Sequence, residues 1–384
     1  MSRKQLVLLF LCNIHPLMLG NGLLPLLPVY SARLGATAVS SGLLLSVTYM
    51  ALVAGSLAAG WLSSRFGRRP LVCILSSGSV VPVIWLMGRV SDPLQLMALT
   101  AFAWCMGGMG LATLSILAGL FAEKHERGRV FGILAMAQGV GAVVGGLSIG
   151  AVADRWGYSG LFLFLAVTGI STPTLSLFLQ DKPSVPRRAP TDQRVASPFG
   201  PPFYLVLLAT GITGVLSAAG RLAASLAMDD LKFPSLAITS TAAIAGVLSL
   251  ILAPLVGRLS DRFNRKLLLA LCYVAGACGL VVLSASLALW QFWLAVSLLS
   301  LQSYAGAGLG SALITDLVPA DAVDKGLSLF SAVPYIGNIA GFAVTGMLIK
   351  GVGMNAALLI CSALGAAAIV VLALVRQRPA LAPA

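Results

Sequence analysis

Two ionisable residues stand out because they lie within long apolar segments. Arg221 is the one Lys or Arg well inside such a segment, and His15 lies in the first of them. A guanidinium there could bind an anionic group or a gating partner, or extend its long side chain to the water interface. A histidine could exchange a proton near neutral pH, or pack and form a hydrogen bond. We therefore consider Arg221 for ligand binding and His15 for proton coupling.

The carboxylates are placed differently. The chain has 12 Asp and Glu residues, and all of them fall near the ends of the apolar segments or in the loops between them. Ionisable groups in the middle of a membrane are costly and usually functional. The sequence thus offers no central carboxylate for proton transfer.

Neutral polar residues near the middle of the apolar segments are better candidates for lining a binding cavity. Tyr335 and Asn338 are three residues apart, so they share one face of a helix. Three methionines could add an adaptable apolar wall, namely Met18, Met106 and Met109. Each of these residues could instead serve helix packing. Together with Arg221, the predicted substrate pathway consists of Asn21, Gln138, Gln302, Tyr335 and Asn338.

The elements that must position these residues are membrane helices. The chain has 384 residues, of which 58% are hydrophobic and 10% charged, and its mean hydropathy is +0.97. Soluble domains carry about 25% charged residues. A spanning helix needs roughly 20 apolar residues, and only helices and closed barrels satisfy their own backbone in lipid. The apolar runs here are long and do not alternate, which indicates helices.

Enzyme chemistry is not expected. The chain contains no Gly-x4-Gly-Lys-Ser/Thr nucleotide-binding motif and no His-Glu-x-x-His motif. Its six cysteines all lie in apolar runs and lack metal-ligand or Cys-x-x-Cys spacing. We therefore expect no cofactor and no metal.

Twelve apolar segments can be counted. A Pro- and Arg-rich stretch without apolar periodicity separates the sixth from the seventh and reads as a linker. We predict an N-terminal six-helix bundle (1–180), a linker (181–202) and a C-terminal six-helix bundle (203–384). The segments are 6–30, 40–63, 71–89, 94–121, 130–153, 160–180, 203–228, 237–256, 267–287, 290–315, 327–349 and 353–375.

The positive charges predict the orientation. The net charge of +13 would suggest nucleic acid in a soluble protein, but here the charges follow the loops. Of the 25 Lys and Arg residues, 19 fall on one side of the predicted spans and 5 on the other, with Arg221 within a span. Cytoplasmic loops carry this excess. Both termini and the linker are therefore predicted to be cytoplasmic, and no nucleic-acid partner is expected.

A sequence repeat divides the chain. Gly-Trp-Leu-Ser-Ser-Arg-Phe-Gly-Arg-Arg at 60–69 returns 197 residues later as Gly-Arg-Leu-Ser-Asp-Arg-Phe-Asn-Arg-Lys at 257–266. Each copy is read as a tight basic loop between two apolar helices. Glycine-rich stretches at 104–110 and 302–308 align at nearly the same offset. Six spans followed by six in the same orientation indicate a parallel repeat about an axis along the membrane normal.

With these motifs the sequence resembles the major facilitator superfamily over essentially its whole length. The family's loop motif is Gly-x-x-x-Asp-Arg-x-Gly-Arg-Arg, and this chain departs from it at Ser64. Trp104 stands where relatives commonly carry the Arg that pairs with that Asp. The resemblance implies an all-α membrane protein of twelve helices in two six-helix halves, with a cytoplasmic gate. The gate residues would be Gly60, Arg65, Gly67, Arg68 and Arg69, with Gly257, Asp261, Arg262 and Arg265 in the second copy.

Span five carries a glycine series. It resembles the family's antiporter motif, Gly-x8-Gly-x3-Gly-Pro-x2-Gly-Gly, although Gly146 replaces the Pro and Ile149 replaces one Gly. The alternative is helix packing, because glycines four residues apart let helices approach closely. The resemblance favours export over uptake. The series consists of Gly132, Gly141, Gly145, Gly146 and Gly150.

The resemblance implies a secondary transporter that works by alternating access in the cytoplasmic membrane, as a monomer in the lipid bilayer. We expect export of small, largely apolar compounds by proton antiport, with His15 as the candidate coupling residue. Many proton-coupled relatives carry a central carboxylate that this chain lacks. Two alternatives are a carrier for a metabolite such as a sugar or organic anion, which would give Arg221 a role, and a non-transporting sensor or scaffold.

Overall fold

The structure is a computed structural model that describes residues 1–123, 126–181, 199–260, 263–319 and 322–375. Within these ranges the chain forms helices and no strands. The elements are α1 (Arg3–Met18), η1 (Leu19–Leu23), α2 (Leu26–Arg33), α3 (Ala38–Phe66), α4 (Arg69–Met87), α5 (Pro93–Phe121), α6 (Arg127–Gly169), α7 (Ser171–Ser176), α8 (Pro201–Asp230), α9 (Ser235–Ser260), α10 (Arg265–Ser284), α11 (Leu289–Ser300), η2 (Leu301–Ala305), α12 (Gly306–Leu317), α13 (Val323–Val352) and α14 (Met354–Ala373).

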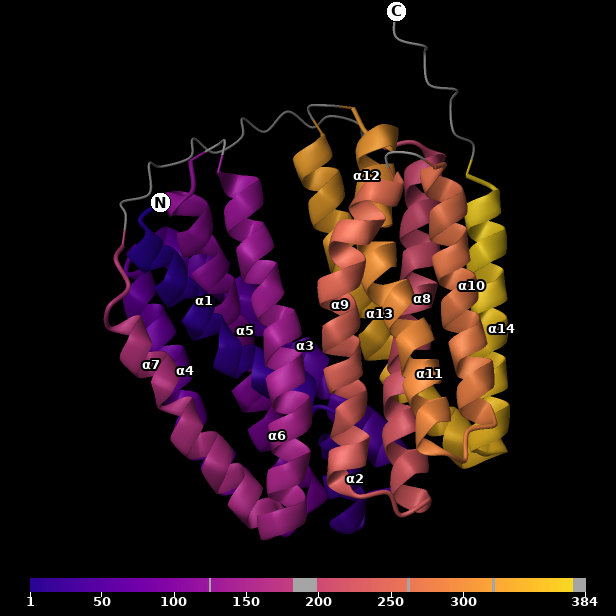
Figure 1. Ribbon diagram of the computed structural model, residues 1–384, viewed down its shortest axis with the longest axis horizontal. Coiled ribbons are helices and arrows are strands. Elements are labelled where there is room, and N and C mark those ends of the chain that lie inside the picture. The colour runs from indigo at the N-terminus through magenta and orange to yellow at the C-terminus, as the bar shows by residue number, and fades with distance from the viewer. Residues whose placement is uncertain (124–125, 182–198, 261–262, 320–321, 376–384) are drawn as a thin grey trace, which may run out of the picture.

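The helices stand in two groups. Figure 1 shows α1 and α3 to α7 on one side and α8 to α14 on the other, with α2 at the foot of the view. The N-terminus lies at the upper end. We call this end of the bundle, which holds Met1, the end of α5 and the start of α8, the terminal end. The opposite end, which holds the α2–α3 and α8–α9 connections, is the distal end.

Within the described residues, eleven helices are long and apolar enough to cross a membrane, one fewer than the twelve predicted segments. The difference lies in α6, because the 48 residues of 129–176 are counted as one helix. A straight helix of that length would measure about 72 Å, more than twice the roughly 30 Å of a bilayer core. Gly157 breaks it with φ 67 and ψ −177, and α6 turns back at the foot of Figure 1. The predicted loop at 154–159 is therefore reduced to a break at Gly157. When the two parts of this helix are counted separately, the described residues contain twelve membrane-crossing helices.

Two spans contain a π-helical turn that the sequence analysis did not predict. The first span is divided into α1, η1 and α2, and the tenth into α11, η2 and α12. In η1, Gly22 packs against the backbone of Gly145, where an added Cβ would come within 2.5 Å of a main-chain carbon. Such bulges insert an extra residue and are frequent at functional sites. Both turns border the central cavity described below.

The basic loops are shorter than predicted. α3 continues through Phe66, and Gly67 ends it in the left-handed conformation with φ 61, which glycine adopts at little cost. Only Gly67 and Arg68 separate α3 from α4. Gly60 lies inside α3, and among the described residues no heavy atom comes within 4 Å of an added Cβ there. In the second copy α9 reaches Ser260, and Asp261 and Arg262 lie outside the described residues.

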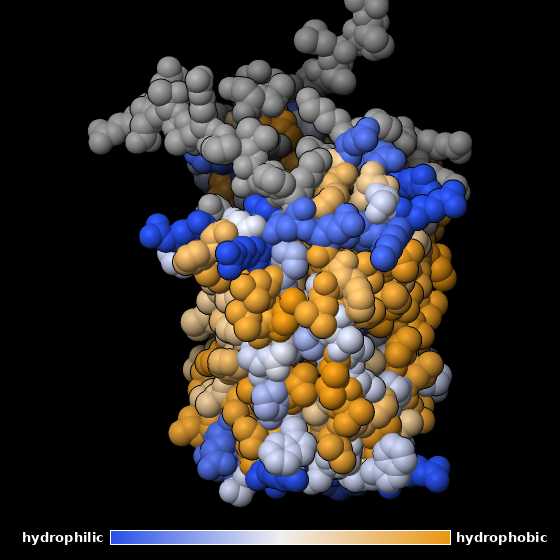
Figure 2. Space-filling model, turned by 90° about the vertical axis from the view of Figure 1, so that its left-hand side faces the viewer, coloured by the Kyte–Doolittle hydropathy of each residue, from blue (hydrophilic) through white to orange (hydrophobic). Residues whose placement is uncertain are grey.

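The outer surface suits a hydrocarbon environment. Figure 2 shows a broad apolar band on this face, with hydrophilic residues gathered above and below it. Large apolar side chains such as Leu57, Leu75 and Leu177 are 72%, 63% and 65% exposed. In water such a surface would drive aggregation. With the eleven long apolar helices, it makes the protein a multi-pass membrane protein.

Candidate functional site: a central cavity open toward the terminal end

A cavity of about 530 Å³ lies between the two groups of helices. Its wall includes His15, Tyr49 and Gln138 from the first group and Arg221 and Tyr335 from the second. It extends along the halves of the helices nearer the terminal end. There it is lined by Cys73 on α4, Leu114 on α5, Tyr273 on α10, Ser311 on α12 and Phe330 on α13. The volume is typical of small-molecule sites.

Arg221 joins the two groups at the inner end of this cavity. It lies on α8, and its side chain is exposed to the cavity. Its Nη1 donates a hydrogen bond to the hydroxyl of Tyr49 on α3. Asp229, the nearest acid on the same helix, lies eight residues away, about 12 Å along the axis, and pairs with Arg33 instead. The side chain therefore projects into the cavity and does not extend toward Asp229.

Aromatic residues surround this bond. The ring of Tyr49 lies 6.4 Å from that of Tyr335 and 5.2 Å from that of Phe342, both on α13. Tyr304, in η2, lies close enough to Arg221 to interact with its charge and has Gln138 as a side-chain partner. Sequence reasoning selected Gln138, Arg221 and Tyr335 but missed Tyr49 and Tyr304. The π-helical turn η2 changes which of its residues face the cavity, and nothing in the sequence indicated that turn.

Three other predicted amides, those of Asn21, Gln302 and Asn338, also border the cavity, and each is bound to a backbone carbonyl. Asn21 Nδ2 donates to the Leu17 carbonyl at 2.9 Å, and Asn338 Nδ2 to the Pro334 carbonyl at 2.7 Å. Gln302 is 3% exposed. Its Nε2 donates to the Thr213 carbonyl at 2.9 Å, and its Oε1 occupies the space where a Cβ on Gly276 would lie. Gln302 therefore connects α8, η2 and α10.

Of the other predicted residues, some line the cavity and some are buried beside it. His15 is buried beside the cavity, with its Nε2 3.2 Å from the carbonyl of Leu165 and its ring against Gly169. A carbonyl can only accept, so Nε2 carries a proton in this contact. Met106 lines the cavity. Met18 is buried in contact with Gly145.

The glycine series on α6 has two faces. Gly141 and Gly145 pack against Leu17 and Met18 of α1, within the first group. Gly146 and Gly150 pack against α9 of the second group, where an added Cβ on Gly146 would come within 2.5 Å of the Ala243 nitrogen. Among the residues that the structure describes, no heavy atom lies within 4 Å of a Cβ added to Gly132. Four of the five glycines therefore serve close helix contact, and two of them join the groups.

Hydrogen bonds reinforce the α6–α9 contact at the distal end. Thr239 Oγ1 donates to the carbonyl of Gly146 at 2.6 Å. The carboxylate of Asp154 accepts from the backbone nitrogens of Ser235 and Leu236 at 2.7 and 2.8 Å. Because these nitrogens begin α9, Asp154 supplies acceptors to a helix N-terminus whose N–H groups have no partner within the helix.

A second contact, between α3 and α13, closes the same end. An added Cβ on Gly42 would lie 2.4 Å from the Phe342 carbonyl, and one on Gly346 would lie 2.6 Å from that of Ala38. Ser46 Oγ donates to the Ile339 carbonyl at 2.8 Å. The two groups therefore touch directly at the distal end, and the cavity extends in the other direction.

The family model described as Major Facilitator Superfamily matches residues 9–310 and 203–384. The chain belongs to the Major Facilitator Superfamily.

Related sequences include named drug-resistance proteins. The chain is 28% identical over 279 residues to "Multidrug resistance protein MdtG" of Klebsiella pneumoniae (strain 342), which covers 68% of this chain and 66% of that protein. It is 26% identical over 283 residues to the protein of the same name from Salmonella typhimurium (strain LT2), with coverages of 70% and 69%. The alignments thus span about two thirds of these relatives.

Solved structures agree on the fold. A crystal structure of the nucleoside transporter NupG matches with a TM-score of 0.78 and 12% identity, over 97% of this chain and 99% of that one. A bacterial homolog of the human lysosomal transporter Spinster, in an inward-facing and occupied conformation, matches with a TM-score of 0.76 and 16% identity, over 99% and 100%. At these identities the likeness concerns the fold alone.

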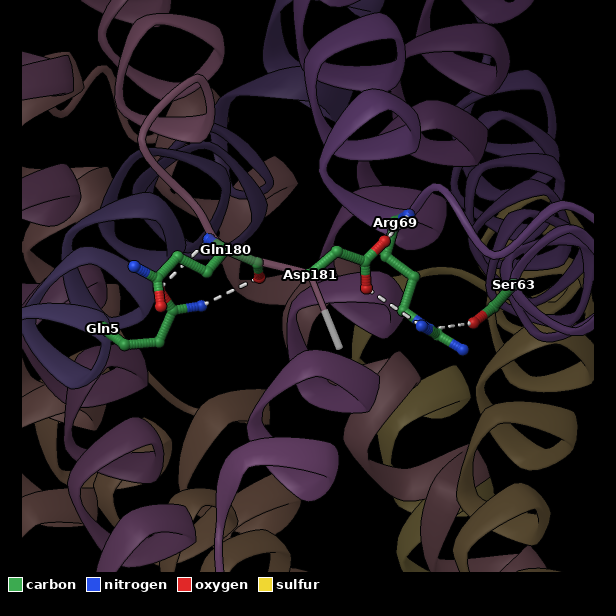
Figure 3. A network of polar contacts seen from close by, with 5 residues as sticks. All are labelled: Gln5, Ser63, Arg69, Gln180 and Asp181. Atoms are coloured by element: carbon green, nitrogen blue, oxygen red, sulfur yellow. Dashed lines mark hydrogen bonds and ion pairs between the residues drawn. The ribbon is translucent and has the colours of Figure 1, made fainter. Parts of the chain in front are cut away.

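In the first copy of the superfamily's loop motif, Arg69 forms contacts within the first group of helices. Arg69, whose side chain is 2% exposed, donates through Nη1 to Asp181 Oδ1 at 2.9 Å and through Nε to Ser63 Oγ at 2.7 Å. Its backbone nitrogen donates to Asp181 Oδ2 at 2.9 Å. Figure 3 shows this network beside Gln5, whose side-chain amide donates to the backbone carbonyl of Gln180 and accepts from its backbone nitrogen. The motif thus holds the chain where it leaves α7 toward the linker.

The remaining predicted gate residues differ in placement. Arg65 and Arg68 are exposed at the terminal end. In the second copy Arg265 forms two hydrogen bonds of 2.8 Å to the carboxylate of Asp316, at the end of α12. Gly257 lies within α9. Asp181 and Asp316 were not predicted as partners, since they follow their arginines by 112 and 51 residues.

Proposed function

We propose that the protein is a secondary transporter that exports small, largely apolar compounds by alternating access. The observation that supports this most is the central cavity, which is closed by direct contacts at the distal end and extends toward the terminal end. A transporter in this form can take up a ligand from the terminal side. Release requires the α3–α13 and α6–α9 contacts to separate and the terminal ends to close.

The proposed moving units are the two six-helix bundles, residues 1–180 and 203–384, joined by the linker 181–202. The contacts that must separate run along α3–α13 and α6–α9. They include glycine-to-backbone packing and the hydrogen bonds of Ser46, Thr239 and Asp154. Arg33 and Asp229 add an ion pair of 3.9 Å between α2 and α8, with Arg33 also over the Tyr158 ring. Exposed pairs of this kind contribute little.

The orientation we propose places the terminal end in the cytoplasm of a cell with the protein in its cytoplasmic membrane. Support comes from the 19 Lys and Arg residues assigned to that side against 5 on the other. With this orientation the cavity faces the cytoplasm, and the exposed Arg65 and Arg68 are available to form the cytoplasmic gate in the opposite state. The names of the MdtG relatives support multidrug export. We propose that the unit is a monomer in the bilayer.

Proton antiport is the proposed energy source, and His15 the proposed coupling residue. Among the described residues of the cavity wall there is no Asp or Glu, and His15 is the one whose side chain titrates near neutral pH in water. Its Nε2 contact to Leu165 connects α1 with α6. A change in its protonation would alter a contact beside the cavity.

A disulfide across the distal contact tests the proposed mechanism. Ser46 and Ile339 are replaced by cysteine in a chain whose six native cysteines are replaced, and uptake is measured in inside-out vesicles under a pH gradient. The test panel holds a lipophilic cation, a neutral drug and an organic anion. Export with alternating access predicts uptake of at least one compound, loss of uptake on oxidation and recovery on reduction. No uptake by the reduced protein, or uptake that survives complete cross-linking, would contradict the proposal.

A further inference from the structure

The charge of the cavity wall is informative about what it binds. Among the described residues that line the cavity, Arg221 is the only Lys, Arg, Asp or Glu. In the part of the chain that the structure describes, its guanidinium forms one hydrogen bond, to a neutral acceptor, the Tyr49 hydroxyl. The cavity therefore has a fixed positive charge with no carboxylate against it.

The guanidinium of Arg221 has hydrogen-bond donors available for a ligand. A guanidinium has five N–H donors in a planar fork, and the bond to Tyr49 uses one of them. The side chain is exposed to the cavity although its residue lies inside the 30-residue helix α8, nine residues from its end at Asp230. A cation at this depth is retained where it faces a cavity or a partner. The remaining donors thus have no described partner and lie beside the space a ligand would occupy, and the fork matches the two oxygens of an anionic group.

The surroundings of Arg221 define the rest of the ligand. The hydroxyls of Tyr304 and Tyr335 line the wall near the guanidinium and can add neutral hydrogen bonds. Away from this point the wall is largely apolar, with Leu52, Val80 and Ala103 among its members. A volume of about 530 Å³ suits a compound the size of a drug.

We propose that the cavity selects small amphiphilic anions, in which one carboxylate, sulfonate or phosphonate binds Arg221 and an apolar body packs along the wall. This inference rests on the proposed transport function and names its substrate class. It predicts that a lipophilic cation of the same shape binds poorly, because the one charge in the wall repels it.

The test uses three compounds that share one apolar body. They are 4-phenylbutyrate, 4-phenylbutanamide and 4-phenylbutylammonium, titrated against the purified full chain in detergent by calorimetry. The proposal predicts that the butyrate binds at least about tenfold more tightly than the other two, the usual effect of hydrogen bonds to a charged group. Equal or tighter binding of the ammonium or the amide, or no binding of the butyrate, would overturn it.

Variants separate the charge from the fold. Arg221→Gln should lose the preference for the butyrate and keep its affinity for the amide. Tyr49→Phe removes the described partner of Arg221 but leaves the charge, so the preference should remain. Arg89 stacks on Trp85 at 3.4 Å and is absent from the cavity wall, so Arg89→Gln serves as the control for loss of a positive charge. A preference that survives in Arg221→Gln would contradict the proposal.

Flux in proteoliposomes distinguishes this inference from the transport function itself. If the ammonium or amide is carried and the butyrate is not, the transport function stands and the anion preference fails. If the butyrate binds through Arg221 but no member of the panel crosses the membrane, the site stands and the transport function fails.

Discussion

The guanidinium of Arg221 on α8 donates a hydrogen bond to the hydroxyl of Tyr49 on α3, at the inner end of the central cavity. The bond connects the two groups of helices where a ligand would sit. Just beyond it, toward the distal end, Ser46 of the same helix α3 bonds to Ile339 of α13. Binding at Arg221 is therefore physically continuous with the contact that closes the distal end, as a transporter with one central site requires.

The glycine contact between α6 and α9 yields the first prediction. Gly146→Ala would place a Cβ within 2.5 Å of the Ala243 backbone. Because the neighbour is backbone, the helices must move apart, and overpacking of this kind costs about 1–3 kcal/mol. We expect a lower midpoint of thermal unfolding in detergent.

The matched control for this change is on the same helix. Gly132 belongs to the same series but has open space around it. Gly132→Ala should be neutral or raise stability by about 0.5–1 kcal/mol, since alanine is the better helix former. Equal destabilisation by the two substitutions would show that the α6–α9 contact is not the cause.

The buried ion pair at the loop motif yields the second prediction. Arg69→Gln removes the guanidinium from Asp181, and removal of one member of a buried pair costs about 3–5 kcal/mol. The side chain of Asp181 is 27% exposed, so water screens part of this loss, and we expect about 2–3 kcal/mol. Chemical unfolding of the purified protein measures the difference.

Arg68 provides the control at the adjacent position. Its side chain is exposed, and Arg68→Gln should change the free energy of unfolding by less than about 0.5 kcal/mol. If Arg68→Gln is as destabilising as Arg69→Gln, the effect belongs to the charge of the loop and not to the contacts with Asp181 and Ser63.

Much of this fold could be predicted from sequence because membrane helices are long, apolar and counted easily. Arg221 could be found because a cation inside an apolar segment is rare. Its partner Tyr49 could not, because spans that are apolar all round show no stripe that tells which face meets the cavity. Tyr304 was missed for a further reason, since η2 alters the helical register around it. Asp181 was assigned to the linker, although it is the acid that Arg69 binds.

His15 yields the third prediction. His15→Gln keeps a side chain that can donate to the Leu165 carbonyl but cannot take up a proton. If His15 couples transport to protons, substrate movement driven by a pH gradient should be lost in proteoliposomes, while equilibrium binding of the substrate is kept. Unchanged coupling would remove His15 from the mechanism, and loss of binding as well would assign it a structural role.

Alternating access is the central claim, and distances across the two ends of the bundle test it most directly. Spin labels at Thr37 and Lys350 report on the distal end, and labels at Arg65 and Lys325 on the terminal end; all four positions are exposed. Pulsed EPR on each pair, with and without ligand and at two pH values, gives the distance distributions. Alternating access predicts two populations whose weights change in opposite senses, with the terminal pair short when the distal pair is long. A single fixed distance at both ends, or ends that open together, would contradict the account.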